Sequence, residues 1–146
     1  MESIKILLVD DHKVIRDGIK FYLEDGSGQY DIVGEASNGV KALDFLKETP
    51  VDLILLDINM DEMDGITCAK EVKSLYPDIK IIALSMLNEN HHIKKMINAG
   101  AAGYVLKNCD EDEIKTAIKT VMKDGTFYSP QVTETIMNSL SKKKTK

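Results

Sequence analysis

VDLILLD, residues 51–57, is the stretch on which the fold depends. It is short, rich in branched apolar residues and nearly free of charge, which predicts a strand buried on both faces of a sheet and ending in the carboxylate of Asp57. Ligands of open parallel sheets bind outside the carboxyl ends of the strands, so polar residues at such ends are expected to meet in one crevice. Three further apolar runs end in this way: Ile4 to Val9 before Asp10 and Asp11, Ile79 to Leu84 before Ser85, and Tyr104 to Leu106 before Lys107.

Helical periodicity fills the segments between the strands. Strand and helix patterns alternate five times, which predicts an α/β fold with a parallel sheet and right-handed crossovers. A less apolar strand at Tyr30 to Ala36 suits a sheet edge. The helix signals are a cap at Asn38 before the apolar stripe Val40, Leu43 and Leu46, a helix from Asn88 to Ala99, and a capping box at Asn108 and Glu111 for a helix that Gly125 closes.

Length and composition exclude several classes of protein. A chain of 146 residues fits one domain that buries its own core without disulfides or structural metal. The net charge of −5 argues against a broad basic face for nucleic acid, and Cys68 and Cys109 are expected to be reduced structural thiols. Because no apolar stretch approaches membrane-spanning length and Met1 does not begin a signal peptide, we expect a cytoplasmic protein with no membrane partner.

The character of the chain changes after Gly125, which divides it into a domain at 1–125 and a C-terminal segment at 126–146. Ser129 and Pro130 form a good helix start, with serine as the cap and proline at the first helical position. This sixth helix carries a single apolar stripe and leads into a solvated, lysine-rich tail. It therefore packs on the domain, pairs with a second copy, or leads into a further domain. The stripe consists of Val132, Ile136, Met137 and Leu140.

The charges at the strand ends predict a divalent cation. Asp10, Asp11 and Asp57 carry −3 and Lys107 returns +1, which leaves −2 in the crevice. Two like charges about 4 Å apart repel by roughly 4 kcal/mol at an effective dielectric near 20, so the crevice needs either raised carboxylate pKa values or a cation. Mg²⁺ suits a few carboxylates together with water and phosphate oxygens. The simpler interpretation, that Asp10 and Asp11 only cap a helix, leaves Asp57 and Lys107 unexplained.

Beside a metal ion, Asp57 is either a further ligand or a nucleophile that accepts a phosphoryl group. Phosphoryl transfer depends on positioning and on neutralising the equatorial oxygens, which Mg²⁺, the Lys107 ammonium and the Ser85 hydroxyl can supply. The sequence contains no GxxxxGKS or GxxxxGKT phosphate loop. The phosphoryl group is therefore expected to arrive on a partner or on a small molecule.

Five short motifs together resemble those of a response-regulator receiver domain of two-component signalling, over Ser3 to about Gly125. They are VDDH at 9–12, LDINM at 56–60, MDG at 63–65, ALS at 83–85 and GYVLK at 103–107. The resemblance implies a flavodoxin-like (βα)5 fold with sheet order 2-1-3-4-5, and phosphoryl transfer from a sensor histidine kinase to Asp57. It also implies Mg²⁺ bound by Asp10 or Asp11, by Asp57 and by the backbone carbonyl of Asn59. Ser85 and Lys107 would contact the phosphoryl group, and Tyr104 would turn inward when Ser85 moves.

Further details resemble the NarL/FixJ type of receiver, which precedes a LuxR-class helix-turn-helix domain. These are the Asp-Asp-His sequence at 10–12 with Arg16 and Gly18, and Asn108 where most receivers have a proline. Residues 125–130 are similar to the lead into that family's interdomain linker. Asp61 in place of a proline and Met86 in place of a small residue are departures that bear on reaction rates.

Three functional hypotheses follow. In the first, phosphorylation of Asp57 controls transcription through a DNA-binding domain missing from this chain, with a homodimer forming on phosphorylation. In the second, the chain is a complete single-domain regulator that acts by protein contacts. In the third, it is a Mg²⁺-dependent aspartyl-phosphate phosphatase with Asp61 or Glu62 as general acid, although no cap insertion is visible. The pair His91 and His92 is predicted to be exposed rather than to form a metal site.

Overall fold

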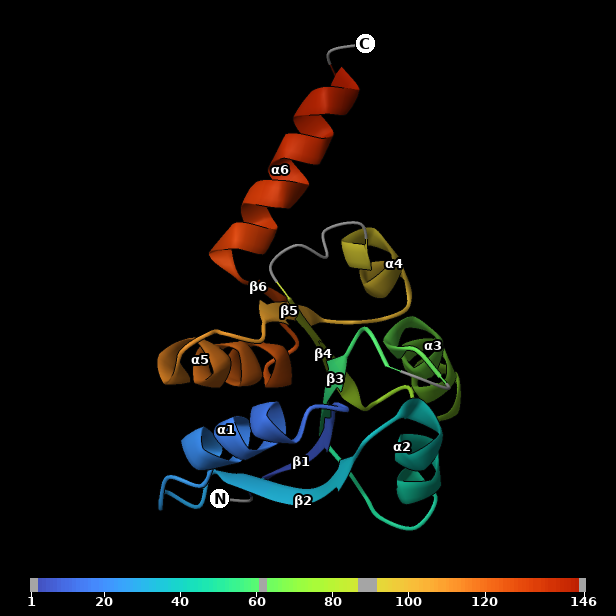
Figure 1. The fold of residues 1–146 in the computed structure, drawn as a ribbon, viewed down its shortest axis with the longest axis vertical. Coiled ribbons are helices and arrows are strands. Elements are labelled where there is room, and N and C mark those ends of the chain that lie inside the picture. Colours follow the sequence, from blue (N-terminus) through green and yellow to red (C-terminus); the bar gives the residue numbers. More distant parts are fainter. Residues whose placement is uncertain (1–2, 61–62, 87–91, 145–146) are drawn as a thin grey trace.

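The computed structural model describes residues 3–60, 63–86 and 92–144, with side chains as far as residue 138. Strands and helices alternate along these residues, as the periodicity predicts (Figure 1). Their order is β1 (Ile4–Val9), α1 (Lys13–Leu23), β2 (Tyr30–Ala36), α2 (Gly39–Leu46), β3 (Leu53–Asp57), α3 (Gly65–Leu75), β4 (Lys80–Ser85), α4 (Ile93–Asn98), β5 (Gly103–Leu106), α5 (Glu111–Met122), β6 (Phe127–Tyr128) and α6 (Pro130–Lys144).

The sheet is parallel throughout, with the strand order β2-β1-β3-β4-β5-β6. The predicted order 2-1-3-4-5 is confirmed, and β2 lies at the edge that its lower hydrophobicity predicts. The sixth strand was not predicted: Phe127 and Tyr128 pair with Gly103 and Tyr104 of β5. Because β6 belongs to the sheet, the start of the C-terminal segment is held against the domain.

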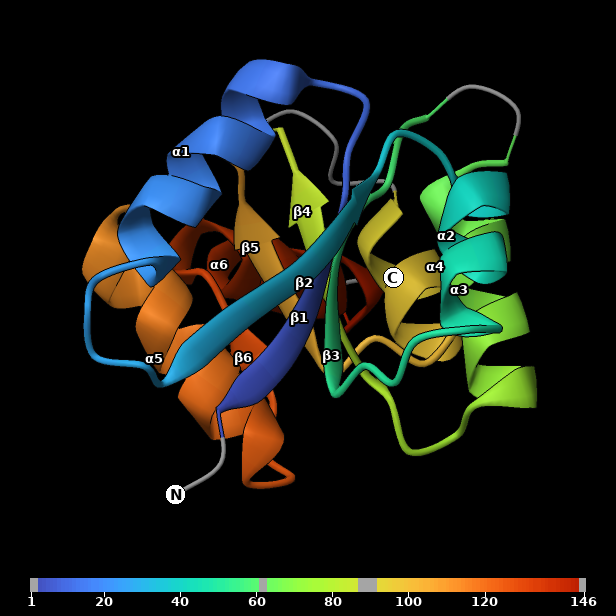
Figure 2. The ribbon, with the colours of Figure 1, turned by 90° about the horizontal axis from the view of Figure 1, so that it is seen from below.

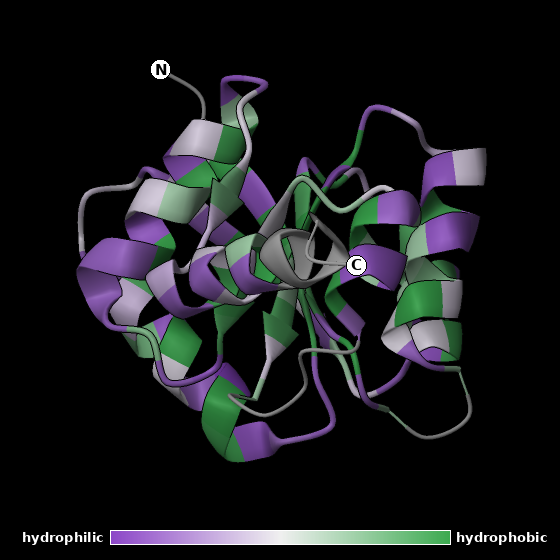
Figure 3. Ribbon diagram, turned by 90° about the horizontal axis from the view of Figure 1, so that it is seen from above, coloured by the Kyte–Doolittle hydropathy of each residue, from purple (hydrophilic) through white to green (hydrophobic). Residues whose placement is uncertain are grey.

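Helices cover both faces of the sheet, with α1 and α5 on one face and α2, α3 and α4 on the other (Figure 2). Successive residues of the central strand alternate between the two cores: Leu53 and Leu55 pack with α1 and α5, whereas Ile54 and Leu56 pack with α2, α3 and α4. Hydrophobic residues accordingly concentrate in the strands and on the inward helix faces (Figure 3). Burial on both faces explains why the central run carries no alternating polar residues.

The helix boundaries correct several details of the sequence prediction. Asn38 caps α2 as expected, accepting a hydrogen bond from the amide of Lys41 (2.9 Å). Val40, however, is 42% exposed, and Ala42 occupies the buried position. The cap of α5 is Asp110 rather than Asn108, because the Asp110 carboxylate accepts from the amide of Glu113 (2.8 Å).

The C-terminal end of α5 also differs from the prediction. The helix ends at Met122, and the left-handed residue that follows is Asp124, with φ of 66°. Gly125 contributes through its amide, which bonds the carbonyl of Thr120 (3.0 Å). In the fourth helix, predicted from Asn88 to Ala99, Ile93 and Met96 are buried as expected, while residues 88–91 lie outside the described residues.

The sixth helix packs on the domain through its first turns and then projects away from it (Figure 1). Val132 is buried, Ile136 packs against the same core, and Met137 is exposed; the side chain of Leu140 lies outside the described side chains. Ser129 is fully buried, but its hydroxyl does not act as the predicted cap. It accepts from the amide of Leu106 (3.2 Å) and donates to the carboxylate of Glu113. In the described part of the chain, no helix is long and apolar enough to cross a membrane.

Candidate functional site

Two neighbouring strands deliver the carboxylates of the site. Val9 of β1 pairs with Leu56 of β3, so Asp10 and Asp57, which follow them, emerge at the same edge of the sheet. Both side chains are only 1% exposed. The backbone amide of Asp10 donates to the carbonyl of Ala36 on β2 (3.0 Å), which continues the sheet hydrogen bonding to the end of β1. The site is therefore positioned by the most regular part of the fold.

Lys107 reaches these carboxylates from the end of β5. Its ammonium lies 3.1 Å from Asp57 Oδ1 and 3.2 Å from Asp10 Oδ2, and its side chain is 4% exposed. The amide of Lys107 bonds the carbonyl of Ser85 at the end of β4 (2.8 Å), which fixes the start of the β5–α5 loop. The structure therefore brings together three of the strand ends that the sequence singles out: those of β1, β3 and β5.

Asp57 carries the strongest electrostatic perturbation in the crevice. Burial, followed by the negative charge of Asp10, raises its pKa from 3.8 to about 7. Lys107 and the amide of Asn59 act in the opposite direction, the latter by donating to Asp57 Oδ1 (3.1 Å). Asp57 Oδ2 is buried and has no hydrogen-bond partner among the described residues. One oxygen of this carboxylate is thus fixed, while the other is available to a ligand.

The crevice has the composition of a divalent cation site. Asp10, Asp11, His12 and Asp57 each place one ligand atom within 4.8 Å of the others. Beside them is a polar hollow of about 310 Å³, lined by Asp11, Asn59, Met60 and Asp64. The unpartnered Asp57 Oδ2 and the surplus of carboxylates over ammonium groups both fit a hard cation with oxygen ligands. Asp10, Asp11 and Asp57, predicted as ligands, are together, and Asn59 lines the adjoining hollow.

The loop after Asp57 is closed by Gly65, the first residue of α3. A Cβ at this position would lie 2.3 Å from the carbonyl oxygen of Asp57 and 2.7 Å from Ile58 Cα, so only glycine fits. The Gly65 amide bonds the carbonyl of Ile58 (2.8 Å), and Asp64 caps α3 at the amide of Thr67 (2.8 Å). This explains the MDG motif, whereas Asp61 and Glu62, considered above as general acids, lie outside the described residues.

Ser85 and Tyr104 are buried beside the crevice, each 1% exposed. The Ser85 hydroxyl donates to the backbone carbonyl of Met86 (2.9 Å). The Tyr104 ring already lies inside the core that contains Ile93 and Met96. The sequence analysis expected Tyr104 to turn inward when Ser85 moves toward a phosphoryl group. In the structure the Tyr104 ring is already inward, although the Ser85 hydroxyl is still hydrogen-bonded to the adjacent Met86 carbonyl.

Two residues that border the site were noted in the sequence only as features of a family type. His12 Nδ1 lies 3.0 Å from Asp10 Oδ1, 3.1 Å from Asp11 Oδ1 and 3.2 Å from Lys107 Nζ. The guanidinium of Arg16 donates to the backbone carbonyl of Asp10 and, at 2.8 Å, to Glu35 Oε1. Their position just after the acidic pair, at the start of a helix that packs near β1, is the signal that could have identified them.

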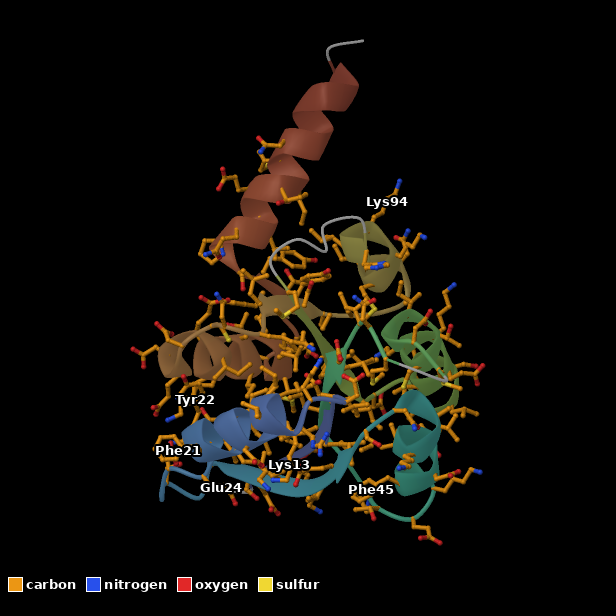
Figure 4. All side chains as sticks on the ribbon, in the orientation of Figure 1. Lys13, Phe21, Tyr22, Glu24, Phe45 and Lys94 are labelled. Carbon is orange, nitrogen blue, oxygen red and sulfur yellow. The ribbon has the colours of Figure 1, made fainter. Side chains whose placement is uncertain are left out.

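Other candidate residues are located elsewhere. Cys68 and Cys109 are free thiols, and burial raises the pKa of each to about 12, in keeping with the predicted structural role. His92 precedes α4 and is partly buried, which differs from the exposed position predicted for it; His91 lies outside the described residues. Along α1, Lys13 lies at the end nearer the site, and Phe21 and Tyr22 lie near the other end (Figure 4).

Comparisons with known proteins agree with this geometry. A model of the response regulator receiver domain family matches residues 6–119. The transcriptional regulatory protein DegU of Brevibacillus brevis is 31% identical over 92% of this chain, and the response regulator VraR of Staphylococcus aureus is 33% identical over 97%. The chain spans only 57% of DegU and 67% of VraR. A two-component response regulator of the LuxR family from Aurantimonas sp. SI85-9A1 has a similar structure, with 27% identity, a TM-score of 0.88 and coverage of 96% of this chain and 99% of that one.

Proposed function

The chain belongs to the response regulator receiver domain family, of the NarL/FixJ type, and on that premise we propose that Asp57 is its phosphorylation site. The observation that carries the proposal is the unpartnered, buried Asp57 Oδ2 beside an ammonium at 3.1 Å from Oδ1. A nucleophilic oxygen has to be free of competing hydrogen bonds, whereas the second oxygen has to be held. Asp57 meets both conditions.

The phosphoryl group is transferred from a phosphohistidine of a sensor histidine kinase. Asp57 Oδ2 attacks phosphorus, the new P–O bond forms as the P–N bond breaks, and the imidazole nitrogen keeps the electron pair of that bond. Lys107 then lies close enough to Asp57 to neutralise one oxygen of the acyl phosphate. Asp10, Asp11, Asp57 and the Asn59 carbonyl would hold Mg²⁺, which would supply charge neutralisation for the transferred group.

Ser85 and Tyr104 form the proposed switch. Contact with the phosphoryl group requires the Ser85 hydroxyl to give up its bond to the Met86 carbonyl. Ser85 pairs with Leu106 in the sheet, and the amide of Leu106 bonds the Ser129 hydroxyl just before α6. A shift of Ser85 is therefore transmitted to the root of the C-terminal helix, with the buried Tyr104 ring adjusting beside it.

The NarL/FixJ type of this receiver domain suggests its output, which is control of transcription. DegU and VraR extend beyond the length matched by this chain, and DegU is a transcriptional regulator. We place the receiver domain at 1–125 and a linker helix with its lysine-rich tail at 126–146, leading to a LuxR-type helix-turn-helix domain that alone contacts DNA. Phosphorylation favours a homodimer of the cytoplasmic protein. A single-domain regulator that acts by protein contacts is the alternative.

Acetyl phosphate provides a kinase-free test of the phosphorylation site. With Mg²⁺, Asp57 displaces acetate from phosphorus, and intact-mass spectrometry should show one added phosphoryl group on the wild-type chain. Asp57→Asn should remain unlabelled. Asp52→Asn, at the opposite end of the same strand region, is the matched control and should label like wild type. Equal labelling of Asp57→Asn and wild type would refute the assignment.

A further inference from the structure

Ser129 joins the root of α6 to the end of β5. In a parallel ladder, one residue donates its amide to the neighbouring strand and accepts at its carbonyl from an amide two residues further along that strand. The Ser129 amide bonds the carbonyl of Tyr104 (3.0 Å), so its carbonyl would be the regular acceptor for the Leu106 amide. That carbonyl instead accepts from the amide of Thr133 (2.9 Å) in the first turn of α6. The Ser129 hydroxyl replaces it and accepts from the Leu106 amide (3.2 Å), so the end of β5 keeps its hydrogen bond.

Glu113 of α5 sets the direction of the Ser129 hydroxyl. A hydroxyl has one proton to donate and two lone pairs. The proton goes to Glu113 Oε2, which leaves a lone pair for the Leu106 amide. A hydrogen bond to a carboxylate is stronger than one between neutral groups, and Ser129 is fully buried, so water does not compete for it. Leu106, Ser129 and Glu113 together form a clasp on the end of β5.

Lys107 is the next residue after this clasp. Its amide bonds the Ser85 carbonyl (2.8 Å) on β4, and its ammonium lies 3.2 Å from Asp10 Oδ2 and 3.1 Å from Asp57 Oδ1. The clasp on the β6 side and Ser85 on the β4 side therefore fix the backbone from which the Lys107 side chain extends. A misplacement of about 1 Å in a group that contacts the reacting atoms can lower a rate about a hundredfold.

We propose that Ser129 is a positioning residue for Lys107, and that the docked root of α6 thereby sets the rate of phosphoryl transfer in the crevice. The inference rests on the proposed function and adds the opposite direction to it, because α6 then acts on the crevice as well as responding to it. Ser129 does not contact the phosphoryl group and acts through the Leu106 amide. A force that pulls the root of α6 away from β5 should slow phosphorylation.

Acetyl phosphate labelling of the full chain, at a series of acetyl phosphate and Mg²⁺ concentrations, tests the proposal. Ser129→Ala removes the hydroxyl and should lower the maximal labelling rate about tenfold. The Mg²⁺ concentration that gives half the maximal rate should change less than about twofold, because Asp10 and Asp57 follow other strands. The matched control is Thr135→Val, which removes a hydroxyl that bonds the Gln131 carbonyl of its own helix (3.0 Å) and should label like wild type.

Variants of Glu113 keep the proposal testable if Ser129→Ala folds poorly. Glu113→Ala removes the acceptor that directs the Ser129 hydroxyl and should also slow labelling. Glu113→Gln keeps an acceptor oxygen at the same place and should restore most of the rate. Equal labelling rates in wild type and in Glu113→Ala would contradict the clasp.

Amide hydrogen exchange supplies a readout that does not depend on phosphorylation. The amides of Leu106 and Lys107 should exchange at least about tenfold faster in Ser129→Ala than in wild type, and at the wild-type rate in Thr135→Val. Labelling of Ser129→Ala at the wild-type rate, or a loss of Mg²⁺ affinity as large as the loss of rate, would overturn the proposal. A wild-type chain that is not labelled, with a faster Lys107 amide in Ser129→Ala, would refute only the phosphorylation assignment, whereas equal Lys107 exchange in both proteins would refute the positioning.

Discussion

The crevice at Asp57 and the ion-pair network at Glu35 use the same kinds of side chain with opposite electrostatic results. Glu35 on β2 accepts from Lys20 (2.9 Å) and Arg16 (2.8 Å), and these cations, Lys20 foremost, lower its pKa. Asp57 has one close ammonium, and burial together with the charge of Asp10 raises its pKa to about 7. Glu35 is paired with two cations, whereas the carboxylates of Asp10 and Asp57 share the single ammonium of Lys107.

This difference separates a structural cluster from a functional one. The Glu35 network satisfies its charges within the chain and ties α1 to β2. The Asp57 crevice is short of positive charge, and the buried Asp57 Oδ2 lacks a hydrogen-bond partner among the described residues. A protein retains such a deficit at a stability cost where a ligand is to supply the missing charge. Arg16 connects the two regions, since it also donates to the carbonyl of Asp10.

Removal of the Lys107 ammonium should have the largest effect on stability, and it tests whether the Asp57 crevice is short of positive charge. Lys107→Met leaves buried carboxylates without their cation and should lower the free energy of unfolding at pH 8 without Mg²⁺ by about 3 kcal/mol, the lower end of the range for a broken buried pair. Urea titration measures this difference. Lys20→Met, which removes a cation from the Glu35 network, should have a clearly smaller effect.

The double variant Lys107→Met with Asp57→Asn keeps this prediction testable if the single variant folds poorly. Neutralising Asp57 removes one of the charges that Lys107 balances, so the double variant should recover much of the lost stability. If Lys107→Met were as stable as wild type, the crevice would not be short of positive charge.

The pH dependence of stability should distinguish the two clusters by its sign. Asp57 ionises near 3.8 when unfolded and near 7 when folded, so between these values the folded state binds the extra proton. Stability without Mg²⁺ therefore falls as pH rises through this window, by at most about 1.4 kcal/mol per pH unit and by roughly 2 kcal/mol from pH 5 to 7. Urea titrations at a series of pH values measure it.

Asp57→Asn isolates this contribution, because it removes the titrating carboxyl group and changes no other residue. The difference in unfolding free energy between the variant and wild type should grow from pH 5 to 7 and then level off. Mg²⁺ binds the ionised carboxylate and should reduce the difference. A difference independent of pH would show that the Asp57 pKa is not raised.

The sequence predicts the oxygen-rich core of the site because strand ends are visible as ends of apolar runs. Asp10, Asp57 and Lys107 needed only the parallel topology to be brought together. His12 was not found as a site residue, because its contacts with Asp10 and Asp11 depend on the conformation of a turn. The direction of the Ser85 hydroxyl is likewise set by rotation about one bond, which no sequence pattern encodes.

The errors in the fold prediction share a cause: tertiary contacts select among equivalent local signals. Asn108 and Asp110 are both good caps, and the turn closed by the amide of Cys109 on the carbonyl of Leu106 (3.1 Å) leaves the cap to Asp110. β6 has only two residues and exists through its pairing with Gly103 and Tyr104. A two-residue strand has no periodicity to detect.

Gly65→Ala tests whether backbone geometry, apart from charge, supports the crevice. The added Cβ would lie 2.3 Å from the Asp57 carbonyl oxygen, and backbone cannot move aside as a side chain can. We expect a loss of about 2 kcal/mol and slower acetyl phosphate labelling of Asp57. The control is Gly18→Ala in α1, where nothing lies within 4 Å of the new Cβ, and a gain of up to about 1 kcal/mol is expected. Labelling at the wild-type rate would show that the loop yields without moving Asp57.

Glu35→Gln should have the smallest effect on stability. It tests the comparison at the cluster whose charges are already balanced within the chain. The lowered pKa of Glu35 means that its ion pairs stabilise the fold above the unfolded value of 4.5 and are lost as pH falls through the folded value, the reverse of Asp57. Because the side chains are partly exposed, we expect at most about 1 kcal/mol at pH 7, reduced by salt. Thermal unfolding at low and high ionic strength measures it. A larger loss, insensitive to salt and accompanied by weaker Mg²⁺ binding, would mean that Glu35 acts on the crevice through Arg16 and that the two regions are one network.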